Sequence, residues 1–493
     1  MKKNLKYLLL MVVSMGIFVS CSEEDLDPTL QQSKDIDISV NSANDLQAIL
    51  NGAYNRMSAS AYYGRDKIIL GEVFSDNTAS NANSNRFVVE ARMDLLPQTA
   101  TALTFWAQAY AVIGSANIII NAEGITGDED QINHIKGQAY AMRALAHFDL
   151  VTFYGQQHVN GGGESAVGVP YVTEFRNEDE LFPARVSVQQ VKENAYADLS
   201  MAQDLMGEAN TKEYISLYAA YAIEARIANY FGEHPRALEA ANFVIDSGLF
   251  SVATSDNFLN SFATKEASNS IFEIAARVAD NEGINGISMI YNQTNYGDVI
   301  VLPNLVGIYE EGDIRGASPF TPGTEPSTVI GLMSNGTYRN VGKYPAIAPY
   351  DDNIVVIRIE EMYLIKAEAL LGTEDGLDAL NMIPENRKTI VFLKDAEGEL
   401  VLDENDDPIE VEVDLTYSEA TIANVLLERR KELAFEGFRF HDLARMGMDI
   451  PFLDATLQTH GGPEYGSFRF AMPLPAGEVD ANANLTQNAG YGA

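Results

Sequence analysis

The stretch at 428–447, ERRKELAFEGFRFHDLARMG, places nine charged side chains and a histidine among aromatic and aliphatic residues. From 422 to 435, a range that overlaps the start of this stretch, apolar positions recur every three or four residues, which is the spacing of a helix with one buried face. Gly437 predicts the end of this helix, and the aromatic residues after it return the chain to the core. The stretch therefore predicts a charged helix packed inside the protein.

Two interpretations fit the charges of this stretch. Glu436, Arg439 and His441 could form a catalytic cluster. Alternatively they belong to a buried polar network that fastens the C-terminal segment to the rest of the fold. Because the charges alternate with aromatic residues over a long run, the pattern favours the network.

Helical spacing extends through most of the chain and predicts a mainly α fold. In 218–250 the pattern predicts a helix to Phe231, a tight turn at 232–235 and a second helix that ends at Gly248. Alanines on both helices would let them approach closely, which is typical of tetratricopeptide units. A degenerate second pair is expected at 360–383. Further helices are expected at 45–57, 101–123, 134–155 and 186–206.

Two segments interrupt the helical pattern. Residues 251–355 mix Gly, Asn, Pro and Tyr without a helical period, which predicts an insertion of loops and short strands. Residues 390–415 alternate apolar and polar positions on both sides of a turn-rich centre, which predicts a hairpin.

The N-terminus predicts export and lipid attachment. Residues 1–20 combine a basic head with an apolar run, as in a signal peptide, and the only cysteine, Cys21, follows directly. A lone cysteine at this position is expected to carry lipid such as palmitate, the alternative being an incidental cysteine in a non-lipidated secreted protein. Residues 21–44 form an acidic, flexible tether. The expected regions are therefore 1–20 (signal peptide), 21–44 (tether), 45–250 (N-terminal helical region), 251–355 (insertion) and 356–493 (C-terminal helical region with the hairpin).

The charge balance excludes some partners. Removal of the signal peptide leaves 30 basic and 70 acidic residues. A surface this acidic argues against binding of nucleic acid and against adsorption to anionic lipid.

No enzyme signature is evident. The sequence has no HExxH, CxxC, P-loop or GxSxG motif, and its six histidines are scattered, so neither a cofactor nor a catalytic metal is expected. The segment 403–414 offers oxygens at spacings similar to a calcium loop, but Pro408 stands where that loop needs glycine. A solvated acidic turn is favoured there.

Five co-linear segments give the chain a family resemblance. The stretch at 428–447 resembles the C-terminal signature of the SusD/RagB family of outer-membrane nutrient-binding lipoproteins. The other matching segments are YYGRDKIILGEVFSDNT (62–78), GQAYAMRALAHFDLVTFYG (137–155), IRIEEMYLIKAEALL (357–371) and MPLPAGEVDANANLTQNAGYG (472–492). The resemblance implies a SusD-like fold and a non-catalytic lid over a SusC-type TonB-dependent transporter. It also implies a location on the exterior of the outer membrane and a role in taking up oligosaccharides or, in some members, oligopeptides.

The resemblance also indicates where a ligand would bind. By region it implies the segments 76–105 and 285–345, in which aromatic faces, planar amides and guanidinium groups suit sugar hydroxyls. The expected ligand-binding residues are Asp76, Asn77, Asn85, Arg86, Tyr291, Asn292, Asn295, Tyr296 and Tyr338. The single tryptophan, Trp106, lies in a predicted core helix, so an aromatic platform would depend on tyrosine. That departure from glycan-binding relatives keeps oligopeptide capture open as the alternative, and a surface hydrolase is the third hypothesis.

Overall fold

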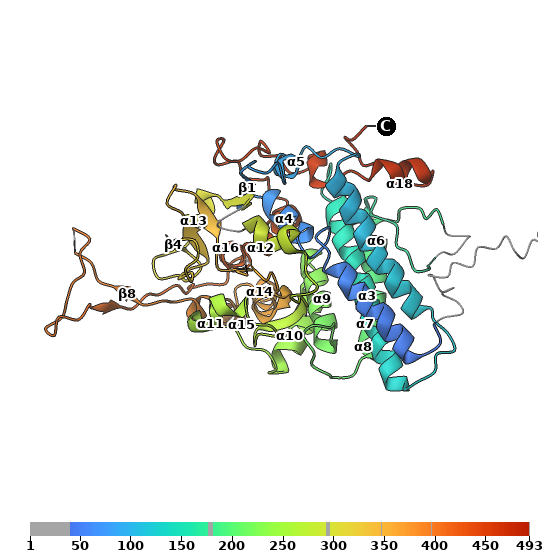
Figure 1. Cartoon of the computed structure of the whole chain (residues 1–493), viewed down its shortest axis with the longest axis horizontal. Helices are drawn as coiled ribbons and strands as arrows, with labels where there is room; N and C mark the ends of the chain where they lie inside the picture. The colour runs from blue at the N-terminus through green and yellow to red at the C-terminus, as the bar shows by residue number, and fades with distance from the viewer. Residues whose placement is uncertain (1–39, 176–180, 292–295, 347, 396, 493) are drawn as a thin grey trace, which may run out of the picture.

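The computed structural model describes residues 40–175, 181–291, 296–346, 348–395 and 397–492. It is mainly helical, as predicted, with long helices gathered on one side of the molecule and short strands and loops on the other (Figure 1). The segment that carries Cys21 and the tether up to residue 39 lie outside the described residues.

The N-terminal half supplies the longest helices, together with several short ones. They are α3 (Ala43–Met57), α4 (Asp66–Val73), α5 (Val88–Ala91), α6 (Ala100–Ile120), α7 (Glu129–Tyr154), the 3-10 helix η2 (Gly163–Ser165), α8 (Val188–Leu205), α9 (Leu217–Tyr230) and α10 (His234–Asp246). Polar side chains start several of them: Ser42, Asp128 and Ser187 each accept a hydrogen bond from a backbone amide in the first turn of α3, α7 and α8. Helix α6 has the length and hydropathy of a membrane span, yet more than half of that stretch is buried, and it packs against α3 and α7.

The remaining helices are shorter. They are α11 (Ser255–Ser261), η4 (Gly283–Asn285), α12 (Ile287–Tyr291), α13 (Pro303–Val306), α14 (Ile359–Ala369), α15 (Glu374–Asn381), η5 (Pro384–Asn386), α16 (Ile422–Glu432), α17 (Arg439–Arg445), η6 (Phe468–Phe470) and α18 (Ala476–Ala481).

The predicted helix pairs are confirmed. Helices α9 and α10 are joined by a tight turn at Gly232, whose φ of +71° suits glycine, and their facing alanines are fully or almost fully buried. Helices α14 and α15 form the second pair, and α14 packs on α10, so that the two pairs stack. Stacking of this kind buries an apolar face that one pair could not cover alone.

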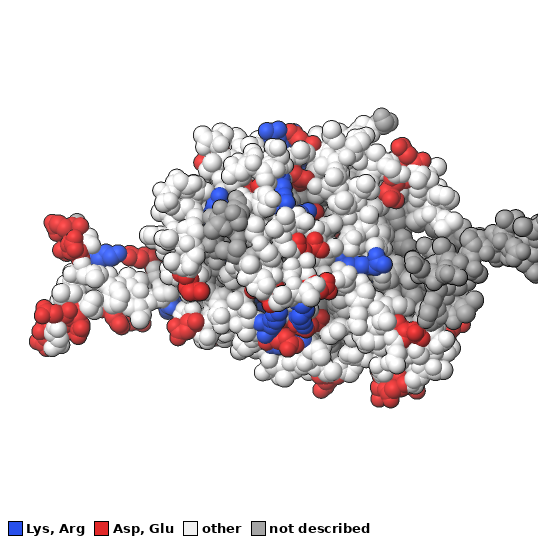
Figure 2. Space-filling model, in the orientation of Figure 1, with Lys and Arg blue, Asp and Glu red and all other residues white. Residues whose placement is uncertain are grey.

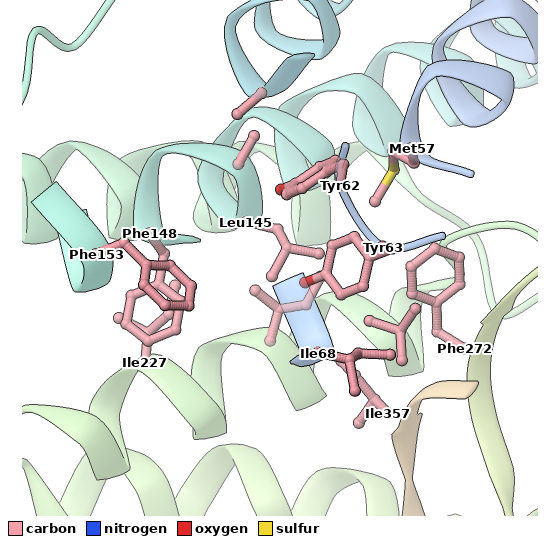
Figure 3. Close-up of a cluster of buried hydrophobic side chains, with 14 of the residues drawn as sticks. Met57, Tyr62, Tyr63, Ile68, Leu145, Phe148, Phe153, Ile227, Phe272 and Ile357 are labelled. Atoms are coloured by element: carbon pink, nitrogen blue, oxygen red, sulfur yellow. The ribbon is translucent and has the colours of Figure 1, made fainter. Parts of the chain in front are cut away.

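The hydrophobic core lies where these helices meet the strands. Figure 3 shows side chains from α3, α4, α7 and α9 converging with Phe272 and Ile357 of two short strands. Within it, the hydroxyls of Tyr62 and Tyr63 both donate to Oδ2 of Asp149, at 2.7 and 2.8 Å. The core therefore joins segments from both halves of the chain.

The strands form small sheets. They are β1 (Thr78–Ser80), β2 (Ser270–Ile274), β3 (Val299–Val301), β4 (Ala317–Pro319), β5 (Ile330–Leu332), β6 (Tyr338–Asn340), β7 (Ile354–Arg358), β8 (Val391–Phe392) and β9 (Glu410–Val411). In the described part of the chain one sheet has the order β1-β3-β6-β5-β4, and β1 pairs antiparallel with β3 so that Thr78 lies opposite Val301. This pairing brings the two segments expected to bind a ligand side by side.

The segment 390–415 differs in part from the predicted hairpin. Strands β8 and β9 pair antiparallel, as expected, with Val391 opposite Val411. Beyond them the chain makes two turns instead of one: the amide of Gly398 donates to the carbonyl of Asp395, and the amide of Asp406 to that of Asp403. The predicted hairpin is therefore confirmed at its base, and its turn-rich centre contains two turns, between which the chain returns to pair with both outer passes.

Helix α16 is held by a buried ion network. The carboxylate of Glu432 accepts hydrogen bonds from Arg315 (2.9 Å), Arg358 (2.5 Å) and Arg387 (2.7 and 2.9 Å). All four side chains are at most 1% exposed. Burial alone would raise the pKa of Glu432, but the surrounding arginines outweigh it and hold this pKa well below its usual value.

The network extends to both sides of Glu432. Glu428 pairs with Arg315, whose guanidinium also binds Asp313. Glu436 pairs with Lys343 (2.6 Å) and with Arg358 (2.8 Å). The favoured interpretation of the 428–447 stretch, a buried network that fastens the C-terminal segment, is confirmed.

The network predicts a large loss of stability when its central charge is removed. Glu432→Gln leaves three buried guanidinium groups without their shared carboxylate, which is expected to cost about 3–5 kcal/mol of unfolding free energy. Urea unfolding followed by circular dichroism measures this change. The matched control is Glu311→Gln, since Glu311 pairs with Lys394 at 3.6 Å with both side chains exposed and should contribute less than about 1 kcal/mol. Equal effects of the two substitutions would contradict the assignment.

Candidate functional site

The two segments expected to bind a ligand meet at one loop surface. Side-chain Nδ2 of Asn81 donates to the carbonyl of Gly297 at 2.6 Å. Arg86 donates to the carbonyl of Ile284 and to Oδ1 of Asn285, both at 3.1 Å. The loop after β1 and the loop around η4 therefore hold each other in place.

Arg86 and Tyr296 are half-buried and lie against each other on this surface. The guanidinium carbon of Arg86 lies 4.5 Å from the centre of the Tyr296 ring, a distance at which the cation and the aromatic face attract each other. Asn85 beside them is exposed and has a φ of +61°. The arrangement presents a flat ring, a guanidinium and an amide to solvent, which are the groups that sugar rings and hydroxyls contact.

On its other side, the loop around η4 borders a small pocket. The pocket has a volume of about 30 Å³, enough for one or two groups the size of a water molecule. Gly64, Gly283 and Gly286 contribute backbone, and Asn281, Tyr344, Tyr350 and Asp352 are among its side chains. Glycines at such a position leave the backbone open to close approach.

Two polar groups distinguish this pocket. The hydroxyl of Tyr344 is buried and has no hydrogen-bond partner among the described residues, although a buried hydroxyl is normally paired. The Asp352 carboxylate accepts a hydrogen bond from the amide of Ala346 at 2.6 Å. Burial raises the pKa of Asp352 to about 6 despite that bond. The pocket therefore contains one unpaired hydroxyl and one carboxyl that changes charge near neutral pH.

A larger hollow continues from the pocket. It has a volume of about 180 Å³ and shares Ser58, Ala275 and Asp280 with the pocket. Its other lining residues include Tyr214 and Arg277, together with Asn51, Asn55 and Glu213. The pocket and the hollow adjoin at Ser58, Ala275 and Asp280, are lined by polar and aromatic side chains, and are together called the groove below.

Three of the expected ligand residues are buried. Asp76 is 1% exposed and pairs with Arg430 (2.9 Å) and Arg439 (2.7 Å). Asn77 donates to Glu72 and accepts from Arg430. Tyr291 is 1% exposed and packs on Phe435. The structure does not support direct ligand contact by these side chains, because their polar groups are engaged inside the protein.

The other expected residues fall into two groups. Asn85, Arg86 and Tyr296 are brought together, as described above. Tyr338 lies in β6 opposite Val301 and is half-buried, so it supports the sheet beneath the loops. Asn292 and Asn295 lie outside the described residues.

The three residues of the alternative catalytic cluster are dispersed. Glu436 belongs to the ion network, and Arg439 pairs with Asp76. His441 packs its ring 4.8 Å from that of Phe153, and neither of its ring nitrogens has a hydrogen-bond partner among the described residues. Burial lowers the pKa of His441 well below its usual value, so the imidazole stays neutral.

Trp106 and the segment 403–414 both lie where the sequence predicts. Trp106 is 3% exposed, with Tyr110 and Tyr154 against its ring, so its predicted place in the core is confirmed. It also borders a hollow of about 320 Å³ between α6 and α18. In the segment 403–414, the Asp403 carboxylate accepts hydrogen bonds from the amides of Asn405 and Asp407, which makes it an exposed acidic turn.

Tyr344 and Asp352 are not among the ligand-binding residues expected from the sequence. Both lie in the irregular segment KYPAIAPYDDN at 343–353, where tyrosines, prolines and acids alternate. That composition indicates loop structure, but it does not show which of these polar groups are buried in a pocket.

Comparison with known proteins gives the chain's relatives. Residues 29–228 match a family model for starch-binding proteins associating with the outer membrane, and residues 310–491 match the SusD family model. The chain is 26% identical to SusD-like protein P2 of Formosa agariphila over 98% of this chain and 99% of that protein. It is 27% identical to the starch-binding protein SusD of Bacteroides thetaiotaomicron over 33% of this chain and 26% of that protein.

Solved structures agree with these matches. A SusD superfamily protein from Bacteroides vulgatus has a TM-score of 0.77 and 25% identity, covering 92% of this chain and 100% of that one. A laminarin-binding SusD-like protein shares the fold with a TM-score of 0.69 and 20% identity, covering 92% of this chain and 100% of that one. The chain belongs to the SusD/RagB family, which is associated with the outer membrane.

Proposed function

We propose that this protein captures oligosaccharides at the cell surface and delivers them to a SusC-type TonB-dependent transporter in the outer membrane. Capture is non-covalent, so the ligand leaves with its bonds unchanged. The ligand would lie across the loop surface and along the groove described above.

The proposal rests on the contact between the loop after β1 and the loop around η4. Arg86 and Tyr296 offer a cation and a ring face on one side of the η4 loop, and Tyr344 and Asp352 offer a hydroxyl and a carboxyl on the other. Stacking on a ring face and paired hydrogen bonds to hydroxyls are the two interactions that hold a neutral sugar in water. Membership of a sugar-binding, non-catalytic kind of protein supports the same conclusion.

Oligopeptide capture by the same surface is the second candidate. The burial of Trp106 favours it, because the exposed aromatic groups of the site are then tyrosines alone. The hollow beside Tyr214 also contains Arg277 and Glu213, which form an ion pair with each other and offer both charges to peptide side chains.

Replacing the exposed ring tests the proposed site. Tyr296→Ala removes the stacking face and the partner of Arg86, and it is expected to weaken oligosaccharide binding about tenfold, equivalent to about 1.4 kcal/mol. Tyr296→Phe keeps the face and should retain most of the affinity. Calorimetry with starch- and laminarin-derived oligosaccharides and a panel of oligopeptides measures both variants.

Tyr221→Ala is the matched control, since Tyr221 stacks on Phe243 in the α9–α10 pair. Peptide binding without any oligosaccharide binding would replace the proposal with the second candidate. Turnover of an oligosaccharide by the purified protein would contradict both.

The pocket carboxyl predicts a pH dependence. As a carboxylate, Asp352 has room on its two oxygens for hydrogen bonds from ligand hydroxyls besides the one from the Ala346 amide, whereas the protonated form accepts fewer. With a pKa of about 6, it is mostly ionised at pH 7 and mostly protonated at pH 5. We therefore expect affinity to fall as the pH is lowered from 7 to 5. Asp352→Asn should flatten this profile in the same calorimetric titrations, and a profile identical to that of the wild type would exclude Asp352 from the site.

Lipid attachment at Cys21 predicts the location of the protein. Cys21→Ser removes the thiol that would accept the acyl chain, so the protein should lose labelling by a palmitate analogue and leave the membrane fraction. Fractionation of the producing bacterium with metabolic labelling measures both changes. Membrane retention of an unlabelled Cys21→Ser protein would show that another feature anchors it.

A further inference from the structure

The segment from Lys388 to Asp414 projects from the body of the protein as an arm (Figure 1). Its base is β8 paired with β9, and its outer part carries the two turns described above. Ala396, near one turn, lies outside the described residues, and nothing below depends on it.

Backbone hydrogen bonds join three passes of the chain within the arm. The amide of Leu393 donates to the carbonyl of Ile409 at 2.8 Å, and the amide of Val401 donates to the carbonyl of Leu393 at 2.9 Å. The amide of Ile409 donates to the carbonyl of Val401 at 3.0 Å. Each pass is therefore tied to both others, which gives the arm a defined shape without a hydrophobic core of its own.

The arm exposes large apolar side chains. Val391, Val401, Ile409 and Val413 are half-buried between the passes. The exposed ones are Ile390, Phe392, Leu393, Leu400, Leu402 and Val411. Several exposed apolar residues gathered on one projecting element mark an interaction surface rather than ordinary surface variation.

The arm is also strongly acidic. Residues 388–414 contain ten acidic and two basic side chains, a net charge of −8. Figure 2 shows the acidic groups crowded at the tips of the arm. Its apolar side chains are thus bordered by carboxylates.

The base of the arm is attached to the body. The amide of Thr389 donates to the carbonyl of Gly312 at 2.8 Å, and Val391 and Val413 pack against the backbone of Gly312. Beyond the arm, the Tyr417 hydroxyl donates to Glu428 of the ion network at 2.9 Å. The arm therefore extends from the most tightly held part of the fold.

The negative charge of the arm limits the kinds of partner that can bind it. A second copy of this chain, with a formal charge of −37, would repel the arm, and so would an anionic lipid surface. A partner that covers both the exposed apolar side chains and the carboxylates around them needs an apolar groove bordered by lysine and arginine side chains. We propose that the arm docks into such a groove on the transporter, an inference that rests on the delivery role in the proposed function.

The arm is tested by measuring how the full-length protein binds a SusC-type transporter from the same bacterium, with both proteins purified in detergent. The double variant Phe392→Ser/Leu402→Ser removes two exposed apolar side chains and should weaken binding about tenfold or more. Glu410→Gln/Glu412→Gln should weaken binding less and reduce its dependence on salt. The matched control, Leu249→Ser/Leu371→Ser, changes equally exposed leucines on the body and should leave the dissociation constant unchanged.

Calorimetry of the isolated variants with oligosaccharide separates the arm from the sugar site. We expect the arm variant to bind oligosaccharide as the wild type does. Three results would overturn the inference. The arm variant could bind the transporter as tightly as the wild type does, or the control variant could bind as weakly as the arm variant. The third is that the wild type does not bind the transporter. If the protein binds the transporter through the arm but binds no oligosaccharide, the docking role of the arm is supported and the proposal of sugar capture is overturned.

Discussion

The buried charge on Glu432 is the constraint on which the rest of the structure depends. Three arginines from distant parts of the chain, Arg315, Arg358 and Arg387, place their guanidinium groups on this one carboxylate. Buried charges at this density are costly unless each has a partner, so moving any of these segments away from Glu432 would leave a buried charge unpaired. The helical pairs supply most of the buried apolar surface, and the network decides where the irregular segments join them.

The loop surface takes its position from the same contacts. Lys343 binds Glu436 and is followed directly by Tyr344 of the pocket. Asp76 binds Arg430 and Arg439, and β1 and the loop with Arg86 follow it. At Gly437, whose φ is +83°, the backbone approaches α4 so closely that a side chain would meet Ile68. The charged stretch at 428–447 thus acts as a scaffold whose contacts set the spacing of the ligand loops.

The helical part of the fold could be predicted from sequence because its signals are local. Alanine spacing and the turn at Gly232 determine the α9–α10 pair within one short segment. The pairing of β1 with β3 joins residues more than 200 positions apart, and short strands carry no pattern that identifies such a partner. Asp76 and Asn77 have the residue types of a sugar site, but sequence does not show that arginines of α16 and α17 would bury them. Arg86 and Tyr296 are half-buried, and Arg86 is held by oxygens of the η4 loop instead of a buried ion pair.

We propose that the protein is a rigid frame that presents its loops for ligand binding. The most direct test of this account is a crystal structure of the protein soaked with an oligosaccharide that it binds. The account predicts an intact oligosaccharide in contact with Tyr296 and Arg86 or along the groove lined by Tyr344 and Asp352. An oligosaccharide bound instead in the hollow between α6 and α18, or present only as cleaved products, would contradict it.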